Sequence, residues 1–214
     1  QRFVGTPRMT SPAAHLVHRM EQLPQPVRFQ WQTTMQALQS PAGAGWQLHS
    51  PEHGPEAQHY QTVLLAVAAP LLEAVAPEAA TLARSAPMRA CWSVMVRCPQ
   101  PVPLPVDGCF VEHNPLRWIA RDSSKPGRSA PETWLLHANH AWSEAHVHDD
   151  AAAVTTALLQ AFAQLGGPDP ASVQATAHRW LYADTAPPLH VNSWWQPEAG
   201  LGLCGDWLHN GTVE

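Results

Sequence analysis

The segment Met88-Arg-Ala-Cys-Trp-Ser-Val-Met-Val-Arg-Cys98 decides how the middle of the chain is interpreted. It contains neither Gly nor Pro, and it includes Trp92 and the β-branched Val94 and Val96, which favours a β-strand. The segments 116–121, 133–138 and 174–183 have the same character. Together these segments predict a β-sheet in the middle of the chain.

A helix is predicted between the last two of these strands. Asp149 or Asp150 can cap its amino end, and Gly166-Gly167 ends it. One face of this helix carries an apolar stripe, made of Val154, Leu158, Phe162 and Leu165. Several strands with one or two helices on one side predict an α+β sheet domain, roughly residues 71–190.

Short elements are predicted on either side of that domain. Ser11-Pro12 can start a helix, with Ser as the N-cap, that presents an apolar face and ends before Pro24. The segments 27–38 and 45–49 are predicted as strands. The nearly all-apolar segment 60–68 is predicted as a strand buried on both faces.

The amino-acid composition argues against several classes of protein. The chain has 214 residues, of which 45% are hydrophobic, so it can bury a core. It has no run of about eighteen apolar residues, which argues against a membrane span. The net charge is −5 and the basic residues do not cluster, which argues against nucleic-acid binding. The four cysteines lack CxxC spacing and are expected to be reduced, which predicts a cytoplasmic location.

Two patterns suggest ligand sites that their context does not favour. Gly200-Leu-Gly-Leu-Cys-Gly205 matches G-x-G-x-x-G, but it follows Trp195-Gln-Pro-Glu198 rather than a buried strand. We therefore expect Leu201–Cys204 to be a strand, with Gly205-Asp206 at its carboxyl end. The histidines of 137–148 could bind zinc, but the segment lacks a metal-ligand signature, so no metal site is predicted.

Two further segments could bind a substrate or could serve packing alone. Arg121, Lys125 and Arg128 follow the strand 116–121 and could hold an anionic group, or form an ordinary strand end. In His178-Arg179-Trp180-Leu181-Tyr182, alternation places the aromatic rings on one face and Arg179 on the other. Those rings could stack on a planar ligand or pack in a core.

Distinctive runs resemble bacterial renalase-like proteins of the flavin-containing amine oxidase superfamily. The most specific are Arg121-Asp-Ser-Ser-Lys-Pro-Gly-Arg128 and Leu203-Cys-Gly-Asp-Trp207. The resemblance also covers 4–9, 60–70, 115–120, 132–138, 142–143 and 178–180. It implies an FAD-dependent oxidoreductase with an inserted substrate-binding sheet.

The resemblance also implies a division of the chain. Residues 1–70 and 191–214 would belong to a discontinuous, partial FAD-binding domain, and 71–190 to the substrate-binding domain. Family members carry a glycine-rich FAD-binding segment before the part matched here and continue beyond Glu214. On this basis the 214-residue chain alone is expected to bind FAD weakly or not at all.

Site residues are carried over by position. The expected FAD contacts are Gly205, Asp206, Val213, Glu214 and Met35, and the expected substrate contacts are Trp118, Arg121, His178, Arg179 and Trp180. The implied reaction is hydride transfer from a reduced pyridine dinucleotide to the flavin, followed by reoxidation with O₂ to hydrogen peroxide. A dihydropyridine has no acidic proton to remove, so no catalytic residue is predicted. Amine oxidation, a non-catalytic binding module and a zinc protein remain alternatives.

Overall fold

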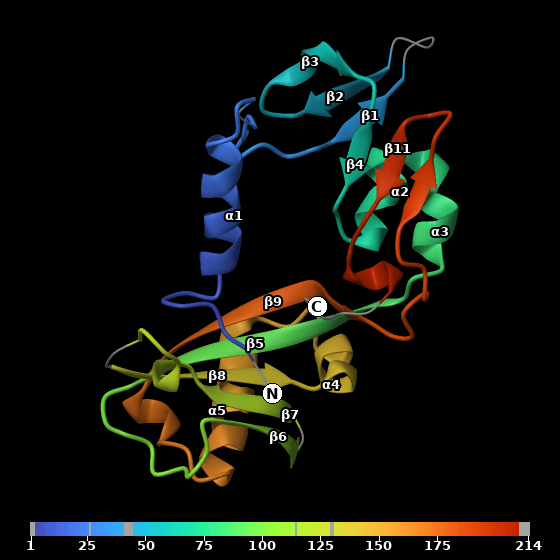
Figure 1. The fold of residues 1–214 in the computed structure, drawn as a ribbon. Coiled ribbons are helices and arrows are strands. Elements are labelled where there is room, and N and C mark those ends of the chain that lie inside the picture. Colours follow the sequence, from blue (N-terminus) through green and yellow to red (C-terminus); the bar gives the residue numbers. More distant parts are fainter. Residues whose placement is uncertain (1–2, 26, 41–44, 114, 129–130, 210–214) are drawn as a thin grey trace. The chain divides into compact units, whose positions relative to one another are not determined.

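The computed structural model describes residues 3–25, 27–40, 45–113, 115–128 and 131–209 (Figure 1). The chain divides into two compact units. The first contains residues 1–29 and 90–181, and the second contains 30–89 and 182–214. Both units combine helices and strands, which confirms the predicted α+β class. Within the described residues, no helix is long and apolar enough to cross a membrane.

The first unit is built on a five-stranded sheet in the order β6-β7-β8-β5-β9. The strands are β5 (Met88–Cys98), β6 (Gly108–His113), β7 (Leu116–Arg121), β8 (Glu132–Ala138) and β9 (Gln174–Thr185). The pairs β6–β7, β7–β8 and β8–β5 are antiparallel. Four of the strands are the predicted ones, and β6 is an addition.

Helix α5 (Ala151–Gln164) covers one face of this sheet (Figure 1). Asp150 caps it by accepting a hydrogen bond from the amide of Ala152, as predicted. Its apolar stripe is buried against the sheet, and the Phe162 ring lies 5.3 Å from that of Trp134. A short helix, α4 (His140–Ala145), follows β8, and the 3-10 helices η3 (Asp122–Ser124) and η4 (Pro170–Ser172) complete the unit.

Helix α1 (Ser11–Glu21) begins where predicted, but two expectations about it are wrong. The N-cap is Thr10, because the hydroxyl of Ser11 instead accepts from the amide of Arg8. No residue of α1 is buried, and Leu16 is 58% exposed. The apolar residues of α1 do lie on one helical face, but among the described residues no other element buries that face.

The second unit contains two three-stranded sheets. One is antiparallel, with β1 (Ala37–Gln39), β2 (Trp46–Ser50) and β3 (Gly54–Tyr60). The other has the order β10-β11-β4, in which β11 (Leu201–Leu203) pairs antiparallel with β10 (Trp194–Gln196) and parallel with β4 (Val63–Leu65). The helices are α2 (Leu72–Val75), α3 (Ala80–Arg84), η1 (Ala69–Leu71), η2 (Pro77–Ala79) and η5 (Asp206–Leu208).

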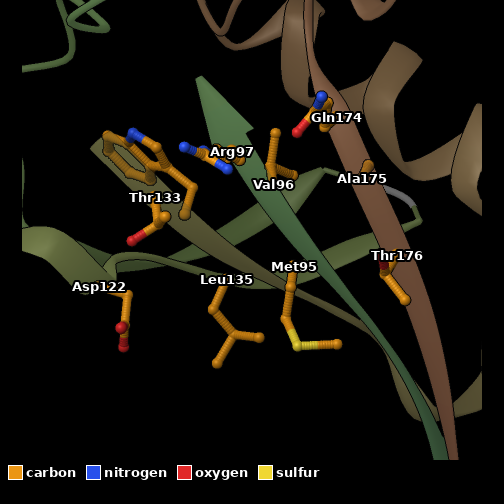
Figure 2. A pocket seen from close by; sticks show the side chains of 10 residues that line it. Met95, Val96, Arg97, Asp122, Thr133, Leu135, Gln174, Ala175 and Thr176 are labelled. Atoms are coloured by element: carbon orange, nitrogen blue, oxygen red, sulfur yellow. The ribbon is translucent and has the colours of Figure 1, made fainter. Parts of the chain in front are cut away.

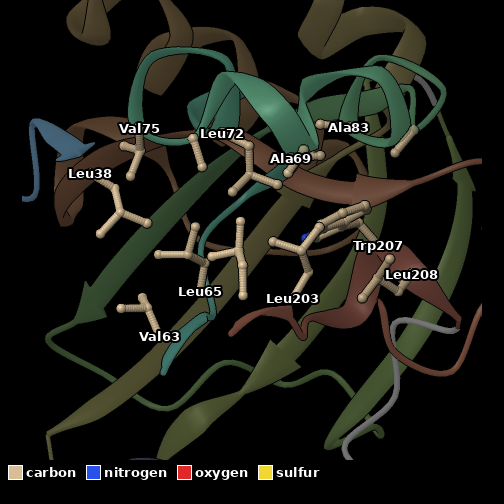
Figure 3. Close-up of a cluster of buried hydrophobic side chains, with 14 of the residues drawn as sticks. Leu38, Val63, Leu65, Ala69, Leu72, Val75, Ala83, Leu203, Trp207 and Leu208 are labelled. Carbon is tan, nitrogen blue, oxygen red and sulfur yellow. The ribbon is translucent and has the colours of Figure 1, made fainter. Parts of the chain in front are cut away.

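Packing in the second unit corrects two predicted strands. The segment 27–38 contributes only the start of β1, and 60–68 contributes only β4 and the end of β3. β4 is not buried on both faces, since Leu64 is 67% exposed while Val63 and Leu65 face the core. Figure 3 shows that core, in which Leu65 and Leu203 from distant parts of the chain lie with Trp207.

Candidate functional site

The sheet face opposite α5, here called the open face, carries most of the chemically interesting side chains of the first unit. Successive residues of a strand point to opposite faces. On β8, Trp134 and Leu136 are buried in the core that α5 covers, so Leu135 and His137 point to the open face. On β5, Met95 points to the open face and is 47% exposed. A sheet with one apolar face left this accessible is typical of a binding surface.

Cross-strand pairing arranges the open face in rows. The first row contains Trp118, His137 and Ser93, because Trp118 pairs with His137 and His137 pairs with Ser93. The Phe110 ring of β6 extends it, 4.8 Å from the Trp118 ring. Gly108 is required beside this row, since a Cβ there would lie 3.0 Å from the indole of Trp118. The first row is therefore a mainly aromatic surface.

The predicted substrate contacts His178 and Trp180 lie on β9 and continue the open face. Their neighbours Ala175 and Ala177 pack into the core on the helix side, so alternation directs His178 and Trp180 the other way. The two rings are 4.4 Å apart in an edge-to-face arrangement, and Trp180 is 54% exposed. The predicted alternation of this strand is confirmed, and the rings are not core packing.

A cavity of about 520 Å³ lies further along the open face (Figure 2). Met95 and Leu135 are cross-strand partners, and Figure 2 shows their side chains side by side, with Thr176 projecting from β9. The next pair along the same strands is Arg97 and Thr133. These residues are not among the predicted substrate contacts. The alternation of 88–98 could have revealed that Met95 and Arg97 share a face.

Arg121 does not point to this surface. Its guanidinium Nη1 donates to Glu132 Oε1 at 3.0 Å and its Nη2 donates to the carbonyl oxygen of Leu104 at 2.6 Å. It also lies over the Trp134 ring, 4.7 Å from the ring centre, on the helix-covered face. These contacts favour a structural role for Arg121 over the predicted contact with substrate.

Arg179 is also separated from the open-face aromatic rings. It donates to the carbonyl oxygen of Val147 and lies 5.7 Å from the centre of the Trp92 ring. Trp92 belongs to the core under α5. The structure thus brings Trp118, His178 and Trp180 to one face and places Arg121 and Arg179 on the other, because an odd spacing along a strand reverses the face.

The cationic loop after β7 is internally neutralised in part. Lys125 Nζ donates to Asp122 Oδ1 at 2.8 Å, and Arg128 pairs with the same carboxylate. Burial opposes ionisation of Asp122, but the hydrogen bonds from Lys125 and Arg128 outweigh it and lower its pKa. The carboxylate therefore stays ionised, and Asp122 lines the open-face cavity beside two cations.

The histidines of segment 137–148 each contact different partners. His140 Nδ1 donates to the carbonyl oxygen of Ala90 at 3.1 Å, and His146 Nδ1 lies 2.6 Å from Asp149 Oδ2. Across the part of the chain that the structure describes, no three His, Cys, Asp or Glu residues are grouped so that they could hold a metal ion. The zinc alternative therefore has no geometric support there.

His137 is the titratable side chain at the centre of the first row. Burial lowers its pKa below the ordinary value, and the nearby positive charges of Arg117 and Lys125 lower it further. We expect an NMR titration of the His137 ring, assigned by its loss in His137→Gln, to have a midpoint below the ordinary His value of about 6.5. As the pH falls, His137 is protonated in the unfolded chain at a higher pH than in the folded one. The free energy of unfolding should therefore decrease as the pH drops below about 6.5. A midpoint above 6.5 would contradict this.

The second unit holds the predicted cofactor contacts. β4 and β11 are parallel, so their carboxyl ends meet at one edge, where ligands bind in α/β sheets. Gly205 and Asp206 are exposed at this edge, and among the described residues the Asp206 carboxylate has no hydrogen bond or ion pair. Met35 is half-buried against the core of the same unit. Val213 and Glu214 lie outside the described residues.

Gly205 also has a packing role that sequence reasoning missed. A Cβ at this position would lie 2.8 Å from Nε1 of Trp207, whose ring is fully buried. The Trp207 Nε1–H donates to the carbonyl oxygen of Val67. Part of the distinctive Leu-Cys-Gly-Asp-Trp run therefore reflects folding, while Asp206 is exposed and takes no part in that packing.

No family model matches the chain. Among solved structures it is similar to a candidate protoporphyrinogen oxidase from Exiguobacterium sp. 255-15, with a TM-score of 0.70 and 17% identity over 93% of this chain and 47% of that one. It is also similar to cyclohexylamine oxidase from Brevibacterium oxydans IH-35A, with a TM-score of 0.61 and 12% identity over 83% of this chain and 43% of that one. For a putrescine oxidase variant with redesigned cofactor binding, the TM-score is 0.56 and the identity 11%, over 82% of this chain and 43% of that one. The chain thus shares their fold and spans less than half their length.

Proposed function

We propose that this chain is part of an FAD-dependent oxidoreductase whose substrate lies on the open face of the five-stranded sheet. The observation that carries the proposal is that Trp118, His178 and Trp180 project from the same open face of the sheet, where His178 and Trp180 are exposed. The oxidase fold that the chain shares with the solved structures supports it. The exposed Asp206 at the parallel strand edge supports a cofactor contact in the second unit.

The preferred substrate is a reduced pyridine dinucleotide. Bound FAD would supply the redox chemistry, through which a hydride from the dihydropyridine carbon, one solvent proton and O₂ would yield hydrogen peroxide and the oxidised pyridinium. The protein's own task is to orient a flat ring, and Trp180, which is 54% exposed, offers a face for stacking. A neutral His137 would add no positive charge beside the pyridinium product.

The cofactor would be held by residues of the second unit. Asp206 would accept hydrogen bonds from sugar-like hydroxyls, since its carboxylate is exposed. Gly205 would allow a phosphate to approach its backbone amide, because it has no side chain. Met35 would contact the adenine. Val213 and Glu214, which lie outside the described residues, would lie near the flavin pyrimidine.

A second candidate function is the oxidation of a primary amine. Cyclohexylamine oxidase and putrescine oxidase share the fold, and an aromatic surface also suits a neutral amine beside a flavin. An open-face cation disfavours this candidate, because Arg97 lines the cavity on the same face and would repel a protonated amine.

The proposal is tested by the colour and reactivity of the complete protein. Purified from its natural full-length gene, it should carry a yellow flavin, and anaerobic mixing with a reduced pyridine dinucleotide should bleach the flavin absorbance faster than any amine does. Trp180→Ala should slow this bleaching at subsaturating substrate by roughly two- to tenfold, the range of one aromatic contact.

Trp195→Ala, on β10 in the second unit, serves as the matched aromatic control and should leave the bleaching rate unchanged. A colourless full-length protein that takes up no flavin would sink the proposal. Faster bleaching by amines would favour the second candidate.

A further inference from the structure

Arg97 is a cation that lines the open-face cavity. Among the residues that the structure describes, Arg97 has no hydrogen-bonding or ion-pair partner, although it is an exposed side chain on a well-formed strand. Arg121, by contrast, is held by Glu132 and two carbonyl oxygens. An exposed guanidinium that lines a cavity and has no partner among the described residues is well suited to pair with an anion.

The carboxylate among the residues that line the cavity does not neutralise Arg97. Asp122 lines the cavity, but it is already paired with Lys125 and Arg128. The positive charge of Arg97 is therefore not offset by Asp122, in a chain whose net charge is −5. An anion entering the cavity would therefore meet a cation without competition from a free carboxylate.

The floor of the cavity beside Arg97 is apolar. Met95 and Leu135 form it as cross-strand partners (Figure 2). Met95 and Arg97 are two residues apart on one strand face, a separation of about 7 Å. A second cavity of about 350 Å³, lined by Pro99 and Ser172, also reaches Arg97. The space thus suits a ligand with a flat apolar group and an anion a short distance away.

We infer that Arg97 binds the phosphate of a nucleotide-type substrate that extends over Met95 and Leu135 toward the aromatic side chains of the same face. This inference rests on the proposed function for the identity of the ring, and it assigns the phosphate contact to Arg97 instead of Arg121 or Arg179. The guanidinium would donate two N–H groups to two phosphate oxygens. Gln174 and Thr176, which line the same cavity from β9, would contact the sugar.

The test compares two ligands that differ only by the phosphate. Nicotinamide mononucleotide and nicotinamide riboside are titrated into the purified protein, and the dissociation constants are measured by calorimetry without turnover. The mononucleotide should bind about ten- to a hundredfold more tightly, the range of one charge-assisted contact. Arg97→Gln should abolish this difference, and Arg97→Lys should keep most of it.

Arg84→Gln is the matched control, because Arg84 is an exposed arginine of the second unit. It should leave the preference for the phosphate unchanged. An unchanged preference in folded Arg97→Gln protein, or equal binding of the two ligands to the unaltered protein, would overturn the inference. Since no flavin reduction is involved, a protein that binds the phosphate but never reduces a flavin would refute the proposed function alone.

Discussion

Replacing Arg121 by Met should lower the free energy of unfolding by about 3–5 kcal/mol, the cost of breaking a buried ion pair from one side. The Arg121 side chain is 18% exposed and that of Glu132 is 13% exposed. Among the described residues, removing the guanidinium leaves the carboxylate with two hydrogen bonds, from the Val102 amide and Trp134 Nε1. It also removes the cation over the Trp134 ring.

Urea unfolding of the variant measures this loss. Arg97→Met is the control, because the same change at an exposed, unpaired arginine of the same unit should alter stability by less than about 0.5 kcal/mol. Adding Glu132→Gln to Arg121→Met should recover part of the loss, since the remaining buried charge is then removed. Equal stability of the two single arginine variants would show that Arg121 is not the structural residue described above.

Trp207→Ala should cost a similar amount, about 3–5 kcal/mol, through the cavity left in the core of the second unit. The ring is fully buried among Leu65, Leu72 and Leu203, and its N–H donates to the carbonyl oxygen of Val67 (Figure 3). The variant loses both the packing and the hydrogen bond. Thermal unfolding followed by near-ultraviolet circular dichroism measures the effect.

Trp195→Ala supplies the comparison for that experiment, because Trp195 is 49% exposed on β10. Trp195→Ala should lower the free energy of unfolding by less than half as much as Trp207→Ala, because Trp195 buries less apolar area. Trp207→Phe should fall between the two, since Phe keeps most of the packing and loses the hydrogen bond. A mild effect of Trp207→Ala would mean that the Leu-Cys-Gly-Asp-Trp run serves a ligand and contributes little to folding.

Local patterns in the sequence determined much of the first unit. Strands β5, β7, β8 and β9 and helix α5 were predicted because each has a period that its own residues establish, two for strands and 3.6 for a helix. The same alternation separated Trp180 from Arg179. Strand β6 was missed, as was the cavity at Arg97, although the spacing of Met95 and Arg97 already placed them on one face.

The tertiary structure alone decided which face of the sheet each strand presents. In β7 the register shifts between Leu116 and Trp118, so Leu116 is buried under α5 while Trp118 points to the open face. A regular alternation would have put both on one face, and no local pattern signals the shift. The role of Arg121 followed from the same geometry, since only the packed structure brings Glu132 within reach.

Long-range pairing was also beyond the sequence pattern. β4 and β11 are three residues each and lie far apart in the chain, yet they form a parallel pair. The pairing aligns their carboxyl ends and so places Gly205 and Asp206 at an edge suited to a ligand. The local sequence predicted a strand over Leu201–Cys204 with Gly205-Asp206 at its carboxyl end, and the structure has that strand at Leu201–Leu203. Its partner was decided by the tertiary structure, because strand pairing depends on which apolar surfaces can be buried together and not on local periodicity.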